Sequence, residues 1–191
     1  MAVTRRALPF GMKVIATRRD LGKPSPEAEK LGVEIVGLDE LLERADFVSL
    51  HLPLTDQSRG LLSSDRLGRM KRGAYLINAA RGEIVDEDAL AELLHGGHLA
   101  GAGVDTFGVI EIFGERSAVP THPLVTADNV IATPHVSALS VDSTRAVAVG
   151  SVGNLVSVLH GHLPHPDHIV NPEVVPRFPL KPHDPTLFDE E

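Results

Sequence analysis

The sequence predicts an α/β protein built on a doubly wound parallel sheet of the Rossmann type. Short apolar segments that fit buried strands alternate with segments of helical periodicity along most of the chain. The clearest unit is residues 74–104, in which a strand, a helix and a second strand follow one another. Arg81 and Asp105 follow its two strands, and open parallel sheets bind ligands beyond the carboxyl ends of their strands. The pattern therefore predicts a binding crevice that contains both side chains.

The helix of this central unit has clear start and stop signals. Asp86 is predicted to be its N-cap, and Glu87 and Asp88 in the first turn suit the positive end of the helix dipole. The glycine pair at 96–97 ends the helix. The strand that follows, residues 100–104, is small and apolar enough to be covered on both faces.

The other elements are predicted in chain order from the same signals. The remaining strands are expected at residues 12–16, 34–36, 47–50 and 130–132. The remaining helices are expected at residues 1–8, 24–31, 39–45, 63–70 and 140–159. Residues 108–128 are predicted to form a long loop that contains proline. Seven of the fourteen prolines follow residue 163, so we predict one domain over residues 1–163 and an extended or disordered tail over residues 164–191.

Composition argues against several classes of protein. The net charge of −8 disfavours a nucleic-acid surface, which normally needs a basic patch. The absence of cysteine removes disulfides, thiolate nucleophiles and cysteine-based metal sites, and it fits a cytoplasmic location. We find no signal-peptide pattern and no apolar stretch long enough to span a membrane, so no membrane partner is expected.

Four histidines form the pattern H-x-H-x-x-H-x-x-H at residues 160–168. That spacing is compatible with a metal such as zinc. The alternative is a solvated turn after the last helix, and we favour it because the segment is rich in proline. No metal site is therefore predicted.

A nucleotide-binding domain of this type is expected to begin with a strand and a glycine-rich phosphate loop. The chain instead begins partway along the helix that would follow that loop, and it contains no G-x-G-x-x-G. Gly101 and Gly103 form G-x-G, but inside a strand and with Thr106 at the sixth position. Without the first strand the centre of the sheet has an unpaired edge, which predicts low stability or aggregation of the isolated chain.

Four motifs together resemble a known family. They are H-L-P-L-T at 51–55, N-A-A-R-G-E-I-V-D at 78–86, G-A-G-V-D-T-F at 101–107 and T-P-H at 133–135. In this order and spacing they resemble the nucleotide-binding domain of the D-isomer-specific 2-hydroxyacid dehydrogenases, which include phosphoglycerate dehydrogenase and glyoxylate/hydroxypyruvate reductases. The resemblance covers roughly residues 5–174. Family members carry an N-terminal substrate domain, so the chain is expected to be a truncated form.

The resemblance implies hydride transfer between NAD(P)H and a small 2-oxo acid or D-2-hydroxy acid. Arg81 suits the substrate carboxylate, because a guanidinium can pair with it through two hydrogen bonds. His135 suits proton donation to the carbonyl oxygen. An acid should orient the imidazole; ungapped alignment puts Ile110 in its place and Glu111 one residue later. Either Glu111 serves as that acid or the acid is absent.

The resemblance also implies a set of cofactor contacts. They are His51, Leu52, Pro53, Ala79, Ala80, Arg81, Asp105 and His135, and the position at the end of the second strand adds Arg18 and Arg19. Asp105 is expected to accept a hydrogen bond from the nicotinamide amide or an adjacent group. Arg18 and Arg19 stand where an aspartate normally holds the ribose of NAD, so we predict a preference for NADP over NAD. The alternative is that the two arginines are only solvated charge.

Two functions stay open at this stage. The first is an oxidoreductase acting on the CH-OH group of small 2-hydroxy acids, which Arg81 and His135 favour. The second is a non-catalytic remnant that binds nucleotide weakly or serves as a dimerisation module, which the missing glycine loop favours. The resemblance further implies a homodimer formed through this domain. The sequence does not reveal which 2-hydroxy acid would be the substrate.

Overall fold

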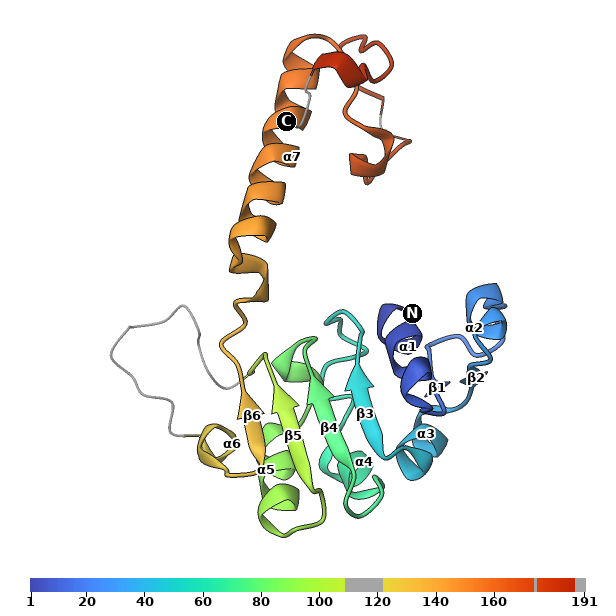
Figure 1. The fold of residues 1–191 in the computed structure, drawn as a ribbon, viewed down its shortest axis with the longest axis vertical. Coiled ribbons are helices and arrows are strands. Elements are labelled where there is room, and N and C mark those ends of the chain that lie inside the picture. Colours follow the sequence, from blue (N-terminus) through green and yellow to red (C-terminus); the bar gives the residue numbers. More distant parts are fainter. Residues whose placement is uncertain (109–121, 174, 188–191) are drawn as a thin grey trace. The chain divides into compact units, whose positions relative to one another are not determined.

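The computed structural model describes residues 1–108, 122–173 and 175–187. The chain divides into two compact units, Met1–His135 and Val136–Glu191. The first unit contains all the strands of Figure 1, and the second contains the long last helix. The predicted domain boundary at residue 163 stays a prediction.

Four strands form a parallel sheet in the first unit. They are β3 (Phe47–Leu50), β4 (Tyr75–Asn78), β5 (Gly101–Val104) and β6 (Val130–Ala132), and they lie side by side in chain order. All three neighbouring pairs are parallel. Each of these strands was predicted within one residue at either end, which confirms the α/β class with a parallel sheet (Figure 1).

Two further strands form a separate parallel sheet. They are β1 (Ile15–Ala16) and β2 (Glu34–Ile35), and they pair only with each other among the described strands. Strand β3 therefore ends the four-stranded sheet on the side away from β4. This break agrees with the unpaired edge that the sequence predicts.

The helices lie close to their predicted positions. They are α1 (Ala2–Ala7), α2 (Pro26–Lys30), α3 (Leu38–Arg44), α4 (Ser64–Gly68), α5 (Glu87–His95), α6 (Pro123–Thr126) and α7 (Val141–Leu159). The 3-10 helices are η1 (Leu8–Phe10), η2 (Gly82–Ile84), η3 (Ser137–Leu139), η4 (Pro166–His168) and η5 (Pro185–Leu187). The predicted N-cap of α5 is confirmed, because the Asp86 carboxylate accepts the Ala89 N–H at 3.1 Å.

One short helix, α6, lies inside the segment that was predicted to be loop. Pro123 occupies its first turn, where a missing N–H costs nothing, and the His122 ring accepts the Leu124 N–H at 3.3 Å. Leu124 is fully buried. The four-residue helix is too short to give a periodic signal, which is why the sequence pattern missed it.

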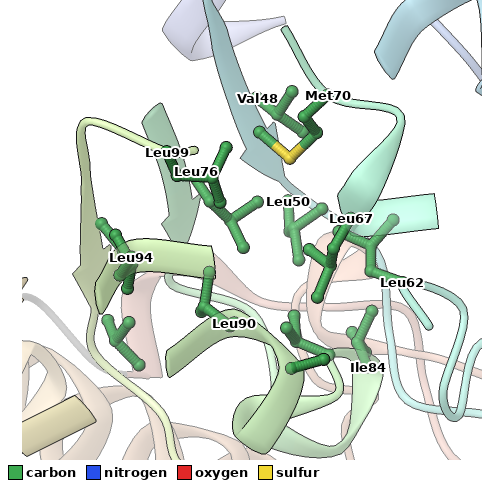
Figure 2. Packing of buried hydrophobic residues seen from close by; sticks show 14 of the residues in the cluster. Val48, Leu50, Leu62, Leu67, Met70, Leu76, Ile84, Leu90, Leu94 and Leu99 are labelled. Carbon is green, nitrogen blue, oxygen red and sulfur yellow. The ribbon is translucent and has the colours of Figure 1, made fainter. Parts of the chain in front are cut away.

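The apolar core lies on one face of the four-stranded sheet, shown in Figure 2. Val48, Leu50 and Leu76 from the strands pack with Leu67 of α4 and Leu90 of α5. Burying such side chains supplies most of the driving force for folding. The core therefore holds α4 and α5 against the sheet.

The opposite face of this sheet keeps large apolar side chains exposed. Phe47 and Tyr75, on neighbouring strands, stack with ring centroids 5.0 Å apart and are 54% and 42% exposed. Ile131 on β6 is 74% exposed. Parallel sheets are normally covered on both faces, and within the first unit, Met1–His135, the core packs against one face only.

Helix α3 (Leu38–Arg44) forms ion pairs with strand β2 and with helix α4. Arg44 donates to Glu34 of β2 at 2.6 Å and to Glu40 at 2.5 Å. At the other end of the same helix, Asp39 accepts from Arg66 of α4 at 3.3 Å. Exposed pairs of this kind are individually weak, but they tie β2 and α4 to one helix.

The second unit contains η3, α7 and the segment after α7. Ser140 caps α7, as the N-terminal signal predicts, by accepting the Ser143 N–H at 3.2 Å. Residues 161–163 pair with Lys181, whose N–H donates to the Gly161 carbonyl at 2.8 Å and whose carbonyl accepts the Leu163 N–H at 2.8 Å. The predicted tail thus contains two 3-10 helices, η4 and η5, and a bridge between His162 and Lys181. Among the helices described, none combines the length and the apolar character needed to cross a membrane.

The Arg44–Glu34 pair gives the fold a predictable pH dependence. The hydrogen bond from Arg44 lowers the pKa of the Glu34 carboxyl below its ordinary value. A carboxyl with a lowered pKa stabilises the folded state above its unfolded pKa, and this contribution is lost as the pH falls through the folded pKa. In Arg44→Met we expect the Glu34 pKa to rise toward the ordinary value of a glutamate, measured by carbon-detected NMR titration.

The matched control for this titration is Arg72→Met, which removes another exposed arginine. The Glu34 pKa should keep its wild-type value in that variant. The same Glu34 midpoint in Arg44→Met and in the wild type would show that the ion pair does not form in solution.

Candidate functional site

The register of the sheet gathers the ends of its four strands at one edge. Leu50, Asn78, Val104 and Ala132 are the last residues of β3, β4, β5 and β6, and they are paired in one row across the sheet. Neighbouring parallel strands lie about 4.8 Å apart. The segments that carry His51, Arg81, Asp105 and His135 therefore leave the sheet along the same edge, where parallel sheets bind their ligands.

The turn that carries Arg81 is built by the buried side chain of Asn78. Its Oδ1 accepts the Ala80 N–H at 3.1 Å, and its Nδ2 donates to the Arg81 carbonyl at 2.9 Å. Asn78 is 2% exposed, and both polar atoms of its side-chain amide form hydrogen bonds with the protein instead of with water. Arg81 itself is exposed, and its Nη1 donates to the Ala80 carbonyl at 2.6 Å.

Gly82 allows this turn to approach the segment that follows β5. A Cβ on Gly82 would lie 2.0 Å from the Gly108 nitrogen and 2.2 Å from the Phe107 carbonyl carbon. No other residue fits such a contact without moving the backbone. The segments after β4 and after β5 therefore touch at Gly82, the residue that follows Arg81.

Asp105 organises the turn that carries His135. Its Oδ1 accepts the Thr133 hydroxyl at 2.5 Å and the His135 backbone N–H at 3.2 Å. His135 has φ +53°, a conformation that residues with a side chain adopt rarely. Such backbone strain clusters at functional sites. Within the described residues, the structure thus brings two predicted site residues together. The contact joins the Asp105 carboxylate to the His135 backbone.

Two arginines follow strand β1. Arg18 is half-buried, and its Nε is buried without a hydrogen-bond partner among the described residues. Arg19 is exposed. A buried donor without a partner is uncommon in folded proteins, so Arg18 fits a place where an anionic group binds.

The other predicted cofactor contacts differ in what they can offer. His51 is exposed and its Nε2 lies 2.9 Å from the Ser49 Oγ. Leu52 is half-buried, and the Pro53 carbonyl accepts the Ser58 hydroxyl at 2.7 Å.

The two predicted alanine contacts also differ. Ala79 is exposed, whereas Ala80 is buried and uses both its N–H and its carbonyl within the Arg81 turn. These contacts stay predictions. Glu111 lies outside the described residues.

Sequence reasoning missed Asn78 and Thr133 as residues that shape the site. Both had a readable signal. An asparagine at a strand end that bonds the backbone two residues on is a common turn former, and Thr133 stands directly after the last strand. In the described ranges no group of three or more histidine, aspartate or glutamate side chains could hold a metal ion.

A parallel α/β sheet with arginine, aspartate and histidine after the carboxyl ends of its strands has the arrangement of a dinucleotide-binding domain. Residues 1–137 match the D-isomer specific 2-hydroxyacid dehydrogenase, NAD binding domain. The chain belongs to this family, and the predicted resemblance is confirmed.

Individual relatives agree with this assignment. The chain is 39% identical over 178 residues to glyoxylate reductase from Korarchaeum cryptofilum, covering 91% of this chain and 49% of that protein. It is 39% identical over 157 residues to hydroxypyruvate reductase from Thermotoga maritima, covering 82% of this chain and 48% of that protein. The chain therefore spans about half the length of the curated relatives it matches.

Solved structures give the same result for the fold. The crystal structure of D-lactate dehydrogenase with NAD+ from Lactobacillus jensenii matches with a TM-score of 0.77 and 32% identity. The match covers 86% of this chain and 50% of that one. The parallel sheet with flanking helices is thus the family's fold.

The contacts of Asp105 predict how the His135 turn responds to substitution. In Asp105→Ala the His135 N–H and the Thr133 hydroxyl lose a charged acceptor, and such a bond contributes about 1.5–3 kcal/mol. We expect the His135 amide to exchange with deuterium roughly 10- to 100-fold faster, measured by NMR. Asp105→Asn keeps Oδ1 as an acceptor and should restore most of the protection.

Asp128→Ala serves as the control, because Asp128 is an exposed aspartate in the same unit. It should leave His135 exchange unchanged. Equal exchange in Asp105→Ala and in the wild type would exclude Asp105 as the residue that holds this turn.

Proposed function

We propose that the protein transfers a hydride between NAD(P)H and a small 2-oxo acid or D-2-hydroxy acid. The single observation that supports this most is the arrangement at the sheet edge. The Asp105 carboxylate accepts the His135 N–H at 3.2 Å. Asp105 follows β5, and Arg81 follows the neighbouring strand β4. Arg81, which can bind an anion, and His135, which can donate a proton, thus both follow strands that end at the same edge of the sheet.

Arg81 has the properties needed to hold the substrate carboxylate. Its guanidinium is exposed on a turn that Asn78 fixes through two hydrogen bonds, so the group that would meet the substrate stands on a rigid base. A planar guanidinium can pair with a carboxylate in two parallel bonds. This pairing would orient the 2-oxo carbon for reaction.

His135 has the properties needed to move the proton. Its ring would donate to the carbonyl oxygen of the 2-oxo acid during reduction and accept the proton back during oxidation. Asp105 would position the ring by fixing its backbone rather than by contacting the imidazole. We also propose that Glu111 is the acid that orients the imidazole.

The residues present fit a dinucleotide. Arg18 has a buried Nε without a described partner, and the carboxyl ends of four parallel strands meet at one edge. When bound, the nicotinamide supplies or takes up the hydride. Arg18 and Arg19 would hold a 2′-phosphate, which supports NADP as the preferred cofactor. Asp105 keeps a second carboxylate oxygen that would accept from the nicotinamide amide.

The names of the relatives suggest the substrate size. Glyoxylate reductase and hydroxypyruvate reductase are both named for small 2-oxo acids, and we propose the same substrate class here. A homodimer and a cytoplasmic location are further proposals, drawn from the family and from the absence of cysteine.

Cofactor choice gives a prediction that does not need turnover. Fluorescence titration of the chain should show saturable binding that favours NADPH over NADH. In Arg18→Asp the preference should shift toward NADH by roughly 10-fold or more, because a carboxylate repels a 2′-phosphate and accepts from a ribose hydroxyl.

Arg6→Asp is the matched control for this titration. It makes the same charge change at an exposed arginine on α1, and it should leave the ratio unchanged. An unchanged ratio in Arg18→Asp would refute the role of Arg18 in cofactor choice.

Arg81 gives the prediction for the reaction. In Arg81→Gln we expect kcat/KM for glyoxylate or hydroxypyruvate to fall on the order of 100-fold, since a charged bidentate pair is lost. The Kd for NADPH should change by a smaller factor than kcat/KM, because the main loss is the pair with the substrate carboxylate. Arg59→Gln, an exposed arginine whose Nη1 lies 3.9 Å from Glu83, is the control.

The wild-type chain separates the two candidate functions in the same assays. Turnover of a 2-oxo acid supports the enzyme. Saturable NADPH binding without turnover supports the nucleotide-binding remnant, and binding of neither cofactor would refute both and leave a dimerisation role.

A further inference from the structure

Glu87 is a buried carboxylate in the first turn of helix α5. It is 5% exposed. Its Oε1 accepts the Gly108 N–H at 2.8 Å. Glutamate is almost never fully buried unless it is paired, and the Gly108 N–H is one group that the Glu87 carboxylate binds.

A second observation lies at the same place. The backbone at Gly82 and the backbone at Phe107–Gly108 are in direct contact, because a Cβ on Gly82 would lie 2.0 Å from the Gly108 nitrogen. A Cβ on Gly108 would lie 3.1 Å from the Glu83 nitrogen. Two glycines thus let two loops meet without side chains between them, and Glu87 bonds to one of these loops from the helix that follows the other.

The two loops carry the candidate chemistry. Gly82 directly follows Arg81, and Gly108 lies three residues after Asp105. The Arg81 loop leaves β4 and the Asp105 loop leaves β5, so their distance is not set by chain connectivity alone. A contact between them sets the backbone from which Arg81 projects relative to the backbone that carries Asp105.

We propose that Glu87 is a positioning residue whose carboxylate, by holding Gly108 against Gly82, locks the loop that carries Arg81 to the loop that carries Asp105. The inference rests on the proposed function only where it concerns substrate. The contact that Glu87 makes between the two loops, called the lock below, involves only the protein's own backbone and does not depend on the proposed function.

The competing explanation is that Glu87 only complements the helix dipole. Its neighbour Asp88 stands in the same turn with its side chain 86% exposed. A dipole interaction therefore does not require burial. It also depends on the charge of the side chain, whereas the lock depends on an acceptor that reaches Gly108.

This difference gives a decisive pair of variants. Glu87→Gln removes the charge but keeps an oxygen acceptor at the same reach. Glu87→Asp keeps the charge in the first turn but withdraws the carboxylate by one methylene. Asp88→Asn is the matched control, because it removes a charge from the same turn without touching Gly108.

The test is hydrogen exchange with mass spectrometry on the whole chain and its variants. In Glu87→Asp we expect the peptides that cover residues 79–86 and 102–108 to lose protection together, about 10-fold or more. The peptide that covers residues 64–70 should keep its wild-type exchange. Glu87→Gln and Asp88→Asn should stay within about twofold of the wild type throughout.

A kinetic measurement connects the lock to the substrate. In Glu87→Asp the KM for glyoxylate should rise about 10-fold with NADPH affinity within twofold of the wild type, and Glu87→Gln should restore the KM. If the wild type shows no turnover, the proposed function fails, and the exchange data decide the lock by themselves.

Three results would overturn the proposal. Protection kept in Glu87→Asp and lost in Glu87→Gln would assign Glu87 a role that depends on its charge and not on its reach to Gly108. Unchanged exchange in both variants would remove any role in joining the loops. Loss of protection across all peptides in both variants would make Glu87 a determinant of folding rather than of position.

Discussion

Four parallel strands that end in one row impose the arrangement on which the rest of this structure depends. Because Leu50, Asn78, Val104 and Ala132 are paired across the sheet, each following loop starts from the same edge. The strand register alone therefore brings the side chains of the site to one region. The site needs only short loops, since each residue added after a strand moves the side chain further from the common edge.

Short loops then need internal supports, and polar side chains provide them. The amide of Asn78 holds the Arg81 turn and the carboxylate of Asp105 holds the His135 turn. Asn78 is buried, and a buried amide is stable only when it is hydrogen-bonded, so it selects one backbone path. Gly82 completes the arrangement by letting two of these loops touch. The exposed arginine and histidine are thus carried by rigid turns.

The same sheet is less complete away from the site. Strands β1 and β2 form a sheet of their own, and Phe47, Tyr75 and Ile131 stay exposed on one face of the other. The chain spans about half the length of the curated relatives it matches. The carboxyl edge, by contrast, is organised by contacts within residues 78–135, which is why the candidate site can be described from this chain.

Local signals in the sequence determined the order and type of the elements and the family. Asp86 and Ser140 are caps where short-range patterns predict them, and the strands at 47–50 and 130–132 have the predicted bounds. Arg81, Asp105 and His135 could be chosen because motifs mark strand ends. Only the tertiary structure decided that Asp105 bonds the His135 backbone and that Gly82 meets Gly108. These features join residues that are distant in the chain, and no local periodicity or capping rule encodes the distance between them.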